Sequence, residues 1–228
     1  MPVWVTRSEP GASRQAAALA AAGYEVVTAP VLQIEATGAA APAAKAAFDH
    51  IIFLSEHAVR SAGRLNFCAG ARVHAIGRRT AGALQTLGVS AEIPERNSSD
   101  GLLEQLAAEQ LTGQSCLIVA GEDGRKTLAE GLQARGARVE EYLCYRRIPA
   151  VVEQAVFRGV THILVASQDG FRAVARLWCS SGLNADVKVI VASDRIAELG
   201  SELGLENLQI AAGAAEEDWI AALENRNA

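Results

Sequence analysis

Short apolar runs rich in β-branched residues alternate along this chain with longer stretches in which apolar residues recur at helical spacing. The short runs predict strands at residues 3–6, 25–28, 50–54, 72–76, 116–120, 162–166 and 187–192. Helices are expected between them, and those at 13–22, 80–87 and 126–135 each end at a glycine, the residue favoured just past a helix end. This alternation predicts an α/β protein with parallel sheets.

The second half of the chain repeats the pattern of the first. The segment VWVTRSEPGASRQAAALAAAGYEVVTAPVLQI resembles CLIVAGEDGRKTLAEGLQARGARVEEYLCYRRI, which lies about 113 residues later. Two further units match in the same order, DHIIFLSEHAVRSAG with THILVASQDGFRAVA and ARVHAIGRRTAGALQTLGV with VKVIVASDRIAELGSELGL. Each half therefore contains a strand–helix–strand segment followed by two strand–helix units.

This duplication allows two arrangements. In the first, the halves form two sequential domains. In the second, residues 31–36 and 141–147, which stay extended beyond the second strand of each half, pair as a ribbon between two lobes. One lobe then takes the middle of the chain and the other takes both ends. Composition does not choose between the two.

Small or hydroxyl-bearing residues follow six of the predicted strands, at the strand ends where open α/β sheets bind ligands. Helices that begin there present free N–H groups and the positive end of the helix dipole to an anion. Arginine follows closely at four of these ends. A single Ser or Thr at such a position is typical of an ordinary helix cap, but its recurrence favours an anion-binding edge.

Composition narrows the class of protein. The 228 residues are 50% hydrophobic and 21% charged, which is typical of a packed globular protein rather than a disordered chain. The net charge of −5 excludes a protein that coats DNA or RNA. A signal-peptide pattern and a membrane-spanning apolar run are both missing, so we expect a cytoplasmic protein with reduced thiols and no membrane contact.

The sequence carries no familiar metal or cofactor motif. It has no Cys-x-x-Cys or His-Glu-x-x-His spacing and no Gly-x-Gly-x-x-Gly after a strand, and GEDGRKT lacks the spacing of a Walker phosphate loop. We therefore expect no metal and no cofactor. Cys116 and Cys144 lie inside strand-like runs and are expected to be buried and unreactive.

Tyr145 is the candidate proton donor. It lies in EYLCYRRIP, the predicted ribbon segment, where it either faces a ligand or covers apolar surface. Tyr142 is the competing aromatic residue. In a regular strand these two side chains point to opposite faces, so only one is expected to face a ligand. The neighbouring pair Arg146 and Arg147 is typical of exposed surface.

Six segments spread over nearly the whole chain resemble the uroporphyrinogen-III synthase family: VTRSEPGASRQAAALAAAGYEVVTAPVLQI, IIFLSEHAVRSAG, AIGRRTAGALQTLGV, PERNSSDGLLEQL, YLCYRRI and VASDRIAELGSELGL. The resemblance implies two flavodoxin-like parallel-sheet lobes joined by a two-stranded β-ribbon, with the active site in the cleft between the lobes. It places residues 1–33 and 152–228 in one lobe, residues 38–142 in the other, and residues 34–37 and 143–151 in the ribbon linker.

The resemblance also implies a cofactor-independent lyase. Its substrate is hydroxymethylbilane, a linear tetrapyrrole octacarboxylate, which it closes to uroporphyrinogen III with loss of water and inversion of ring D. A monomer is implied, with transient handover of substrate from the preceding enzyme of the pathway. Tyr145 matches the catalytic tyrosine of the family. The matching substrate-binding positions are Arg7, Ser55, Gly77, Thr80, Ser98, Ser99, Gly101, Ser167 and Ser193.

The last unit departs from the family pattern, because Ile196 stands where relatives carry a threonine hydroxyl. Arg195 is then the expected anion contact at that strand end. A different interpretation of the whole chain is a non-catalytic two-lobed module that binds a small polyanion. A nucleotide-dependent enzyme is a third, which the missing phosphate loop disfavours.

Overall fold

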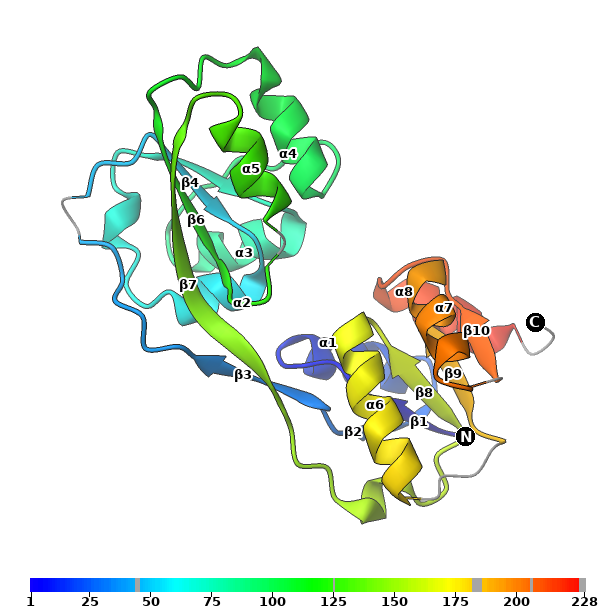
Figure 1. The fold of residues 1–228 in the computed structure, drawn as a ribbon. Helices are drawn as coiled ribbons and strands as arrows, with labels where there is room; N and C mark the ends of the chain where they lie inside the picture. Colours follow the sequence, from blue (N-terminus) through cyan, green and yellow to red (C-terminus); the bar gives the residue numbers. More distant parts are fainter. Residues whose placement is uncertain (44–45, 125, 182–185, 206, 226–228) are drawn as a thin grey trace. The chain divides into compact units, whose positions relative to one another are not determined.

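The computed structural model describes residues 1–43, 46–124, 126–181, 186–205 and 207–225. The chain divides into two compact units. Unit 1 comprises Met1–Gln33 and Ile148–Ala228, and unit 2 comprises Ile34–Arg147. Unit 1 is therefore built from both ends of the chain, and in Figure 1 its blue strands share a sheet with yellow-green to red ones.

Unit 1 contains one parallel sheet in the order β10-β9-β8-β1-β2. Its strands are β1 (Pro2–Val5), β2 (Glu25–Thr28), β8 (His162–Val165), β9 (Lys188–Val191) and β10 (Leu208–Ile210). Its helices are α1 (Gly11–Ala21), α6 (Gln168–Ser181), α7 (Asp194–Glu202) and α8 (Glu216–Glu224), with a short 3-10 turn at Gln154–Phe157.

Unit 2 contains a second sheet in the order β3-β7-β6-β4-β5, in which β7, β6, β4 and β5 are parallel. Its strands are β3 (Leu32–Ala36), β4 (His50–Phe53), β5 (Arg72–Ala75), β6 (Ser115–Gly121) and β7 (Arg138–Pro149). Its helices are α2 (Glu56–Ser61), α3 (Arg78–Thr86), α4 (Ser99–Gln105) and α5 (Thr127–Gln133), with 3-10 turns at Asn66–Cys68 and Leu106–Ala108.

Strands β3 and β7 are neighbours, and they pair in opposite directions. The N–H of Thr37 donates to the carbonyl of Cys144, whereas the N–H of Ala150 donates to the carbonyl of Val31. Residue numbers therefore fall along one strand as they rise along the other. Both points at which the chain passes from one unit to the other lie within these two strands.

The two sheets share one topology. Read from one side, unit 1 has the order β2-β1-β8-β9 and unit 2 has the order β7-β6-β4-β5. Beyond β9 comes β10, and beyond β5 an isolated parallel bridge joins His74 to Glu92. Each unit thus combines the strand–helix–strand segment of one half of the repeat with the two strand–helix units of the other half. Both have the flavodoxin-like order, so the predicted α/β class with two parallel-dominated sheets is confirmed.

The core of each unit lies on both faces of its sheet, because successive residues of a strand alternate between two clusters. In unit 1, Trp4 packs with residues of α6 and α7, whereas Val3 and Val5 pack with residues of α1 and α8. In unit 2, Ile51 and Ile52 likewise belong to different clusters. The strands are buried on both sides, which explains their continuous apolar runs.

The structure also confirms the glycine caps. Gly23, Gly88 and Gly136 follow α1, α3 and α5 with φ of 86°, 77° and 83°, a left-handed conformation that residues with a Cβ rarely adopt. The predicted strands and these three helices begin and end within two residues of the observed ones. Among the described residues, no helix combines the length and apolar character needed to span a membrane.

Candidate functional site

The candidate site in unit 2 lies where the strand order of its sheet reverses. Strands β4 and β6 are neighbours there, and helices α2 and α5 leave their carboxyl ends. Ligands of doubly wound sheets bind at this point. Ser55 follows β4, Gly121 ends β6, and Tyr145 lies opposite Gly121 on β7. The fold therefore brings two predicted site residues, Ser55 and Tyr145, to one place.

The Tyr145 side chain is 3% exposed, and its hydroxyl has two polar neighbours. The Ser55 Oγ lies 3.1 Å from the tyrosine oxygen, and Arg147 donates to that oxygen from Nη2 at 3.3 Å. The guanidinium carbon of Arg147 also lies 5.5 Å from the ring centroid, and the His57 ring lies 5.7 Å away in a tilted arrangement. The phenol is thus held between a hydroxyl and a cation.

Gly121 makes room for the Tyr145 ring. A Cβ at position 121 would lie 2.6 Å from the tyrosine Cζ, closer than carbon atoms approach without displacement. The N–H of Glu122 donates to the Tyr145 carbonyl at 2.9 Å, so the backbones of β6 and β7 are fixed together at this point. Glycine at position 121 is a requirement of this close approach rather than of a turn.

The expectation that Tyr142 and Tyr145 point to opposite faces is wrong, because β7 carries a β-bulge. Leu143 lies opposite Ala120 and Tyr145 opposite Gly121, so Cys144 is an extra residue in the ladder. Tyr142, Cys144 and Tyr145 consequently belong to one core cluster. The rings of Tyr142 and Phe67 pack edge-on, with their centroids 6.2 Å apart. Burial raises the pKa of the Tyr142 hydroxyl.

Other predicted donors of unit 2 lie at the beginnings of its helices. Ser55 caps α2 and Ser98 caps α4, each accepting a backbone N–H at 3.0 Å. Gly77 occupies the N-cap position of α3 in an extended conformation, and Ser99 is the first residue of α4. A Cβ on Gly101 would overlap the carbonyl oxygen of Arg96, so only glycine fits this turn.

The predicted donors of unit 1 lie at three strand ends. Ser167 accepts the N–H of Gly170 at 3.1 Å and so caps α6. Ser193 occupies the N-cap position of α7 without a side-chain cap bond. Arg195 is exposed and donates to the Gln168 side chain at 2.6 Å, which joins the starts of α6 and α7. The half-buried Arg7 donates to the Ala214 carbonyl at 3.5 Å.

The position of Ile196 explains why an apolar residue can stand where relatives carry a threonine, and Thr80 is the matching residue of unit 2. Each is the third residue of its helix, α7 and α3, and each is 4% exposed. Ile196 packs in the core of unit 1, so the position favours an apolar side chain there. Thr80 is equally buried in unit 2.

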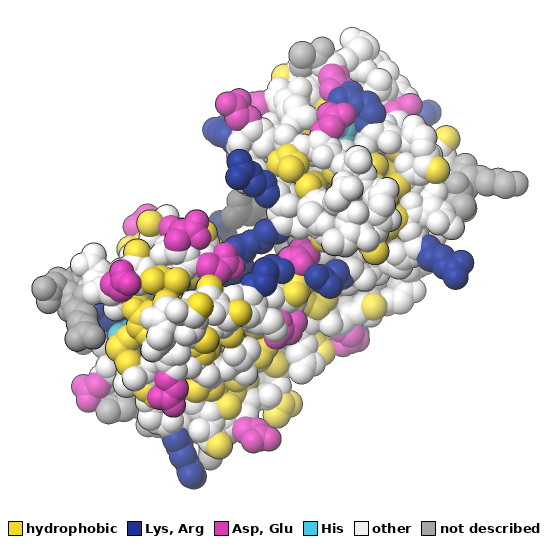
Figure 2. Space-filling model, turned by 180° about the vertical axis from the view of Figure 1, so that it is seen from behind, with side chains coloured by type: hydrophobic (Ala, Val, Ile, Leu, Met, Phe, Trp, Pro, Cys, Tyr) yellow, Lys and Arg dark blue, Asp and Glu magenta, His cyan; other side chains and the backbone are white. Residues whose placement is uncertain are grey.

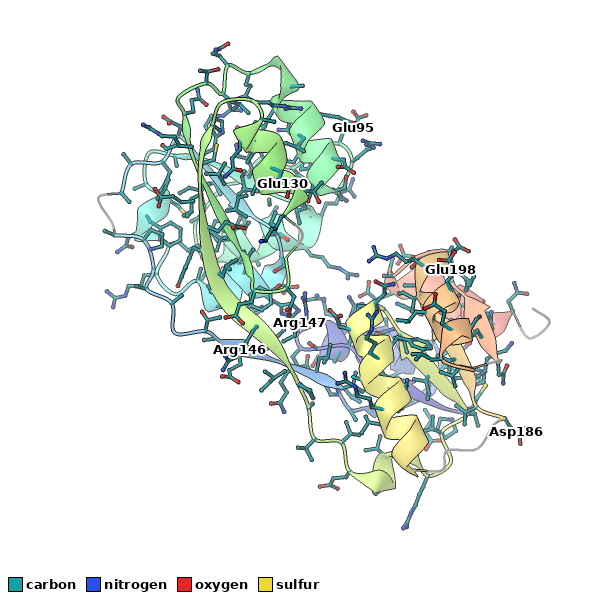
Figure 3. The ribbon with its side chains drawn as sticks, in the orientation of Figure 1. Glu95, Glu130, Arg146, Arg147, Asp186 and Glu198 are labelled. Carbon is teal, nitrogen blue, oxygen red and sulfur yellow. The ribbon has the colours of Figure 1, made fainter. Side chains whose placement is uncertain are left out.

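Sequence reasoning missed Arg147, His57 and Gly121 as neighbours of Tyr145. Their contacts depend on the bulge and on packing between strands, for which the sequence shows no local signal. Arg146, by contrast, is exposed and pairs with Glu35 at 2.6 Å, as expected for surface. Figure 3 labels Arg146 and Arg147, which are neighbours on β7. Arg125, the arginine after β6, lies outside the described residues.

The described residues contain no group of three or more His, Cys, Asp or Glu that could hold a metal ion. Cys116 and Cys144 are buried, and burial raises the pKa of both thiols to about 11, as expected for unreactive cysteines. The side chain of Cys179 lies outside the described ones. Acidic and basic side chains are interspersed on the face shown in Figure 2.

A second polar cluster lies around the start of β4, at the opposite end of that strand from Ser55. His50 begins β4, and its Nδ1 lies 2.9 Å from Nε2 of His74 on β5. The other nitrogen of His50 lies 2.7 Å from the Gln114 side-chain oxygen, which can only accept. His50 therefore carries its proton on Nε2, and His74 donates from its own Nε2. That leaves Nδ1 of His74 buried without a hydrogen-bond partner, 3.9 Å from Glu92.

A family model for uroporphyrinogen-III synthase HemD matches residues 13–221. The uroporphyrinogen-III synthase of Salmonella typhimurium is 31% identical over 247 aligned positions, which cover 98% of this chain and 100% of the relative. The uroporphyrinogen-III synthase of Escherichia coli is 32% identical over 161 aligned positions, which cover 66% of this chain and 65% of the relative.

Solved structures share the fold. Helicobacter pylori uroporphyrinogen-III synthetase superposes with a TM-score of 0.67 at 15% identity, covering 99% of both chains. A mutant uroporphyrinogen III synthase of Thermus thermophilus gives 0.59 at 18% identity, covering 99% of this chain and 100% of that one.

Proposed function

The chain belongs to the uroporphyrinogen-III synthase family, and we propose that it closes hydroxymethylbilane to uroporphyrinogen III with inversion of ring D. The observation that carries the proposal is the match to a synthase along essentially its entire length. The hydroxyl pair of Ser55 and Tyr145, at the strand-order reversal of unit 2, supplies the chemistry that the reaction needs.

The first chemical step is the departure of the terminal hydroxyl group of the substrate. Hydroxide is a poor leaving group, so a positioned acid that converts it to water lowers the barrier. In this proposal the acid is the phenol of Tyr145. The electron-rich pyrrole then stabilises the resulting cation, so the enzyme acts as a lyase without a cofactor. What remains is to hold the chain ends in the geometry that leads to inversion.

Carboxylate side chains of the substrate bind to hydroxyl groups, backbone N–H groups and guanidinium groups at the strand ends. In unit 1 the proposed positions are Arg7, Ser167, Ser193 and Arg195; in unit 2 they are Ser55, Gly77, Thr80, Ser98, Ser99 and Gly101. Residues 34–37 and 143–151 form the linker in this proposal, between a lobe of residues 1–33 and 152–228 and a lobe of residues 38–142. The protein acts as a monomer and receives its unstable substrate from the preceding enzyme.

The test uses freshly prepared hydroxymethylbilane. Incubation with the protein, oxidation and chromatographic separation should give the type III isomer, because without an enzyme closure proceeds without inversion to type I. Heat-denatured protein is the control. Type I as the only product would refute the proposal. Tight tetrapyrrole binding without conversion would instead support a non-catalytic binding module.

A further inference from the structure

The contacts of Tyr145 leave a path for its proton through Ser55. Arg147 has only donors, so the tyrosine oxygen accepts from its Nη2. The Ser55 Oγ lies 3.1 Å from the same oxygen, and either hydroxyl can be the donor of that hydrogen bond. When the phenol donates, Ser55 accepts both from Tyr145 and from the N–H of Ala58, which lies at 3.0 Å. The hydrogen of Ser55 is then free to be donated onward.

Burial separates the roles of the two hydroxyls. The Tyr145 side chain is nearly enclosed, whereas Ser55 is half-buried at the carboxyl end of β4. Arg147, which is also half-buried, contacts both the ring and the hydroxyl of Tyr145. The enclosed phenol is therefore in contact with a cation and with a hydroxyl that is less buried than itself.

We infer that Ser55 relays the proton of Tyr145 to the leaving hydroxyl, and that Arg147 is a positioning residue that stabilises the phenolate left behind. The inference rests on the proposed function. The carbon–oxygen bond of the substrate breaks as Ser55 gives its hydrogen to form water and takes that of Tyr145. Ring closure forms a carbon–carbon bond and releases one pyrrole proton, which returns through Ser55 to Tyr145. Protons thus balance over the cycle, and the net loss is water.

Arg147 is suited to this role because a hydrogen bond to a charged oxygen is stronger than one to a neutral oxygen. Its contribution therefore grows as the proton leaves, which favours the transition state over the ground state. Arg146 provides a matched control one residue away. Alternation along β7 sends it to the other side of the strand, where it pairs with Glu35.

The first experiment compares Arg147→Gln, Arg147→Lys and Arg146→Gln. We expect Arg147→Gln to lower kcat about tenfold to a hundredfold with little change in KM, Arg147→Lys to restore part of it, and Arg146→Gln to match the wild type. An equal loss of kcat in Arg147→Gln and Arg146→Gln, or a loss in Arg147→Gln that appears in KM rather than in kcat, would overturn the role of Arg147.

The isomer assay separates the proposed function from the inference. If the wild type produces no type III isomer, the proposed function fails whatever the variants show. If the wild type does produce it and Arg147→Gln keeps the kcat of the wild type, only the inference fails.

The second experiment tests the relay at Ser55. Ser55→Asn keeps an acceptor for the start of α2, and therefore the fold, but has no hydroxyl to pass a proton. Ser55→Thr keeps both. We expect kcat to fall at least about tenfold in Ser55→Asn and to remain within about threefold of the wild type in Ser55→Thr. Equal kcat in the two variants, with unchanged circular dichroism, would show that Tyr145 acts without Ser55.

Discussion

Replacement of His74 by Gln should weaken the response of stability to acid. The His74 ring is 0% exposed, and burial lowers its pKa from 6.5 to about 4. The charges of His50 and Arg72 lower this pKa further, whereas the carboxylates of Glu92 and Glu109 raise it. The ring is therefore neutral in the folded protein throughout the physiological range.

The sign of the effect follows from proton binding. Between pH 6.5 and pH 4 the unfolded chain binds a proton at His74 that the folded chain does not, so acid favours unfolding. The stability from this residue is complete above about pH 6.5 and is lost as the pH falls towards 4. With these two pKa values the loss between pH 7 and pH 5 is about 2 kcal/mol. The full range corresponds to about 3 kcal/mol.

Urea unfolding at pH 7 and pH 5 measures this loss. Gln at position 74 keeps a donor for His50 but does not titrate, so the stability gap between wild type and His74→Gln should shrink by about 2 kcal/mol at pH 5. Far-ultraviolet circular dichroism reports both units, whereas all three tryptophans belong to unit 1 and their fluorescence serves as an internal comparison. His162→Gln is the comparison variant. Burial also lowers the pKa of this partly buried ring, but less far, so the stability gap of this variant should shrink less. A gap that is equal at both pH values would refute the reasoning.

Three further predictions concern the site. Tyr145→Phe should retain the folded circular dichroism spectrum and lower kcat roughly a hundredfold; unchanged turnover would remove Tyr145 from the mechanism. Gly121→Ala should push against the tyrosine ring, which should lower the free energy of unfolding in urea by about 1–3 kcal/mol and also reduce turnover. Gly82→Ala, with open space around its Cβ position, should preserve both stability and turnover. Arg7→Gln should raise KM roughly threefold to tenfold without lowering kcat, and a KM equal to that of the wild type would exclude Arg7 from substrate binding.

The sequence predicted the elements well because they depend on local pattern. Continuous apolar runs mark strands buried on both faces, and the glycines after α1, α3 and α5 mark helix ends through a conformation that other residues rarely adopt. The internal repeat also left both the sequential and the crossed arrangement open. Only the pairing of β1 with β8, and of β4 with β6, chooses the crossed one.

The site was less accessible to sequence reasoning, because its geometry depends on one inserted residue in a ladder. Cys144 shifts the alternation of β7, and this shift brings Tyr145 to the same core cluster as Tyr142. A bulge leaves no compositional trace. The contact of Gly121 with the tyrosine ring and the orphaned nitrogen of His74 likewise arise between strands that are distant in sequence.

The crossed arrangement has a consequence for the order in which a ribosome delivers the two units. Unit 2 is continuous in sequence, from Ile34 to Arg147, and is complete once that stretch has left the exit tunnel. The strand–helix–strand segment at the start of unit 1 must wait for β8 and β9, which emerge after unit 2. During synthesis the N-terminal segment therefore remains without the neighbouring strands of its sheet while unit 2 folds, and its apolar strands are exposed for that time.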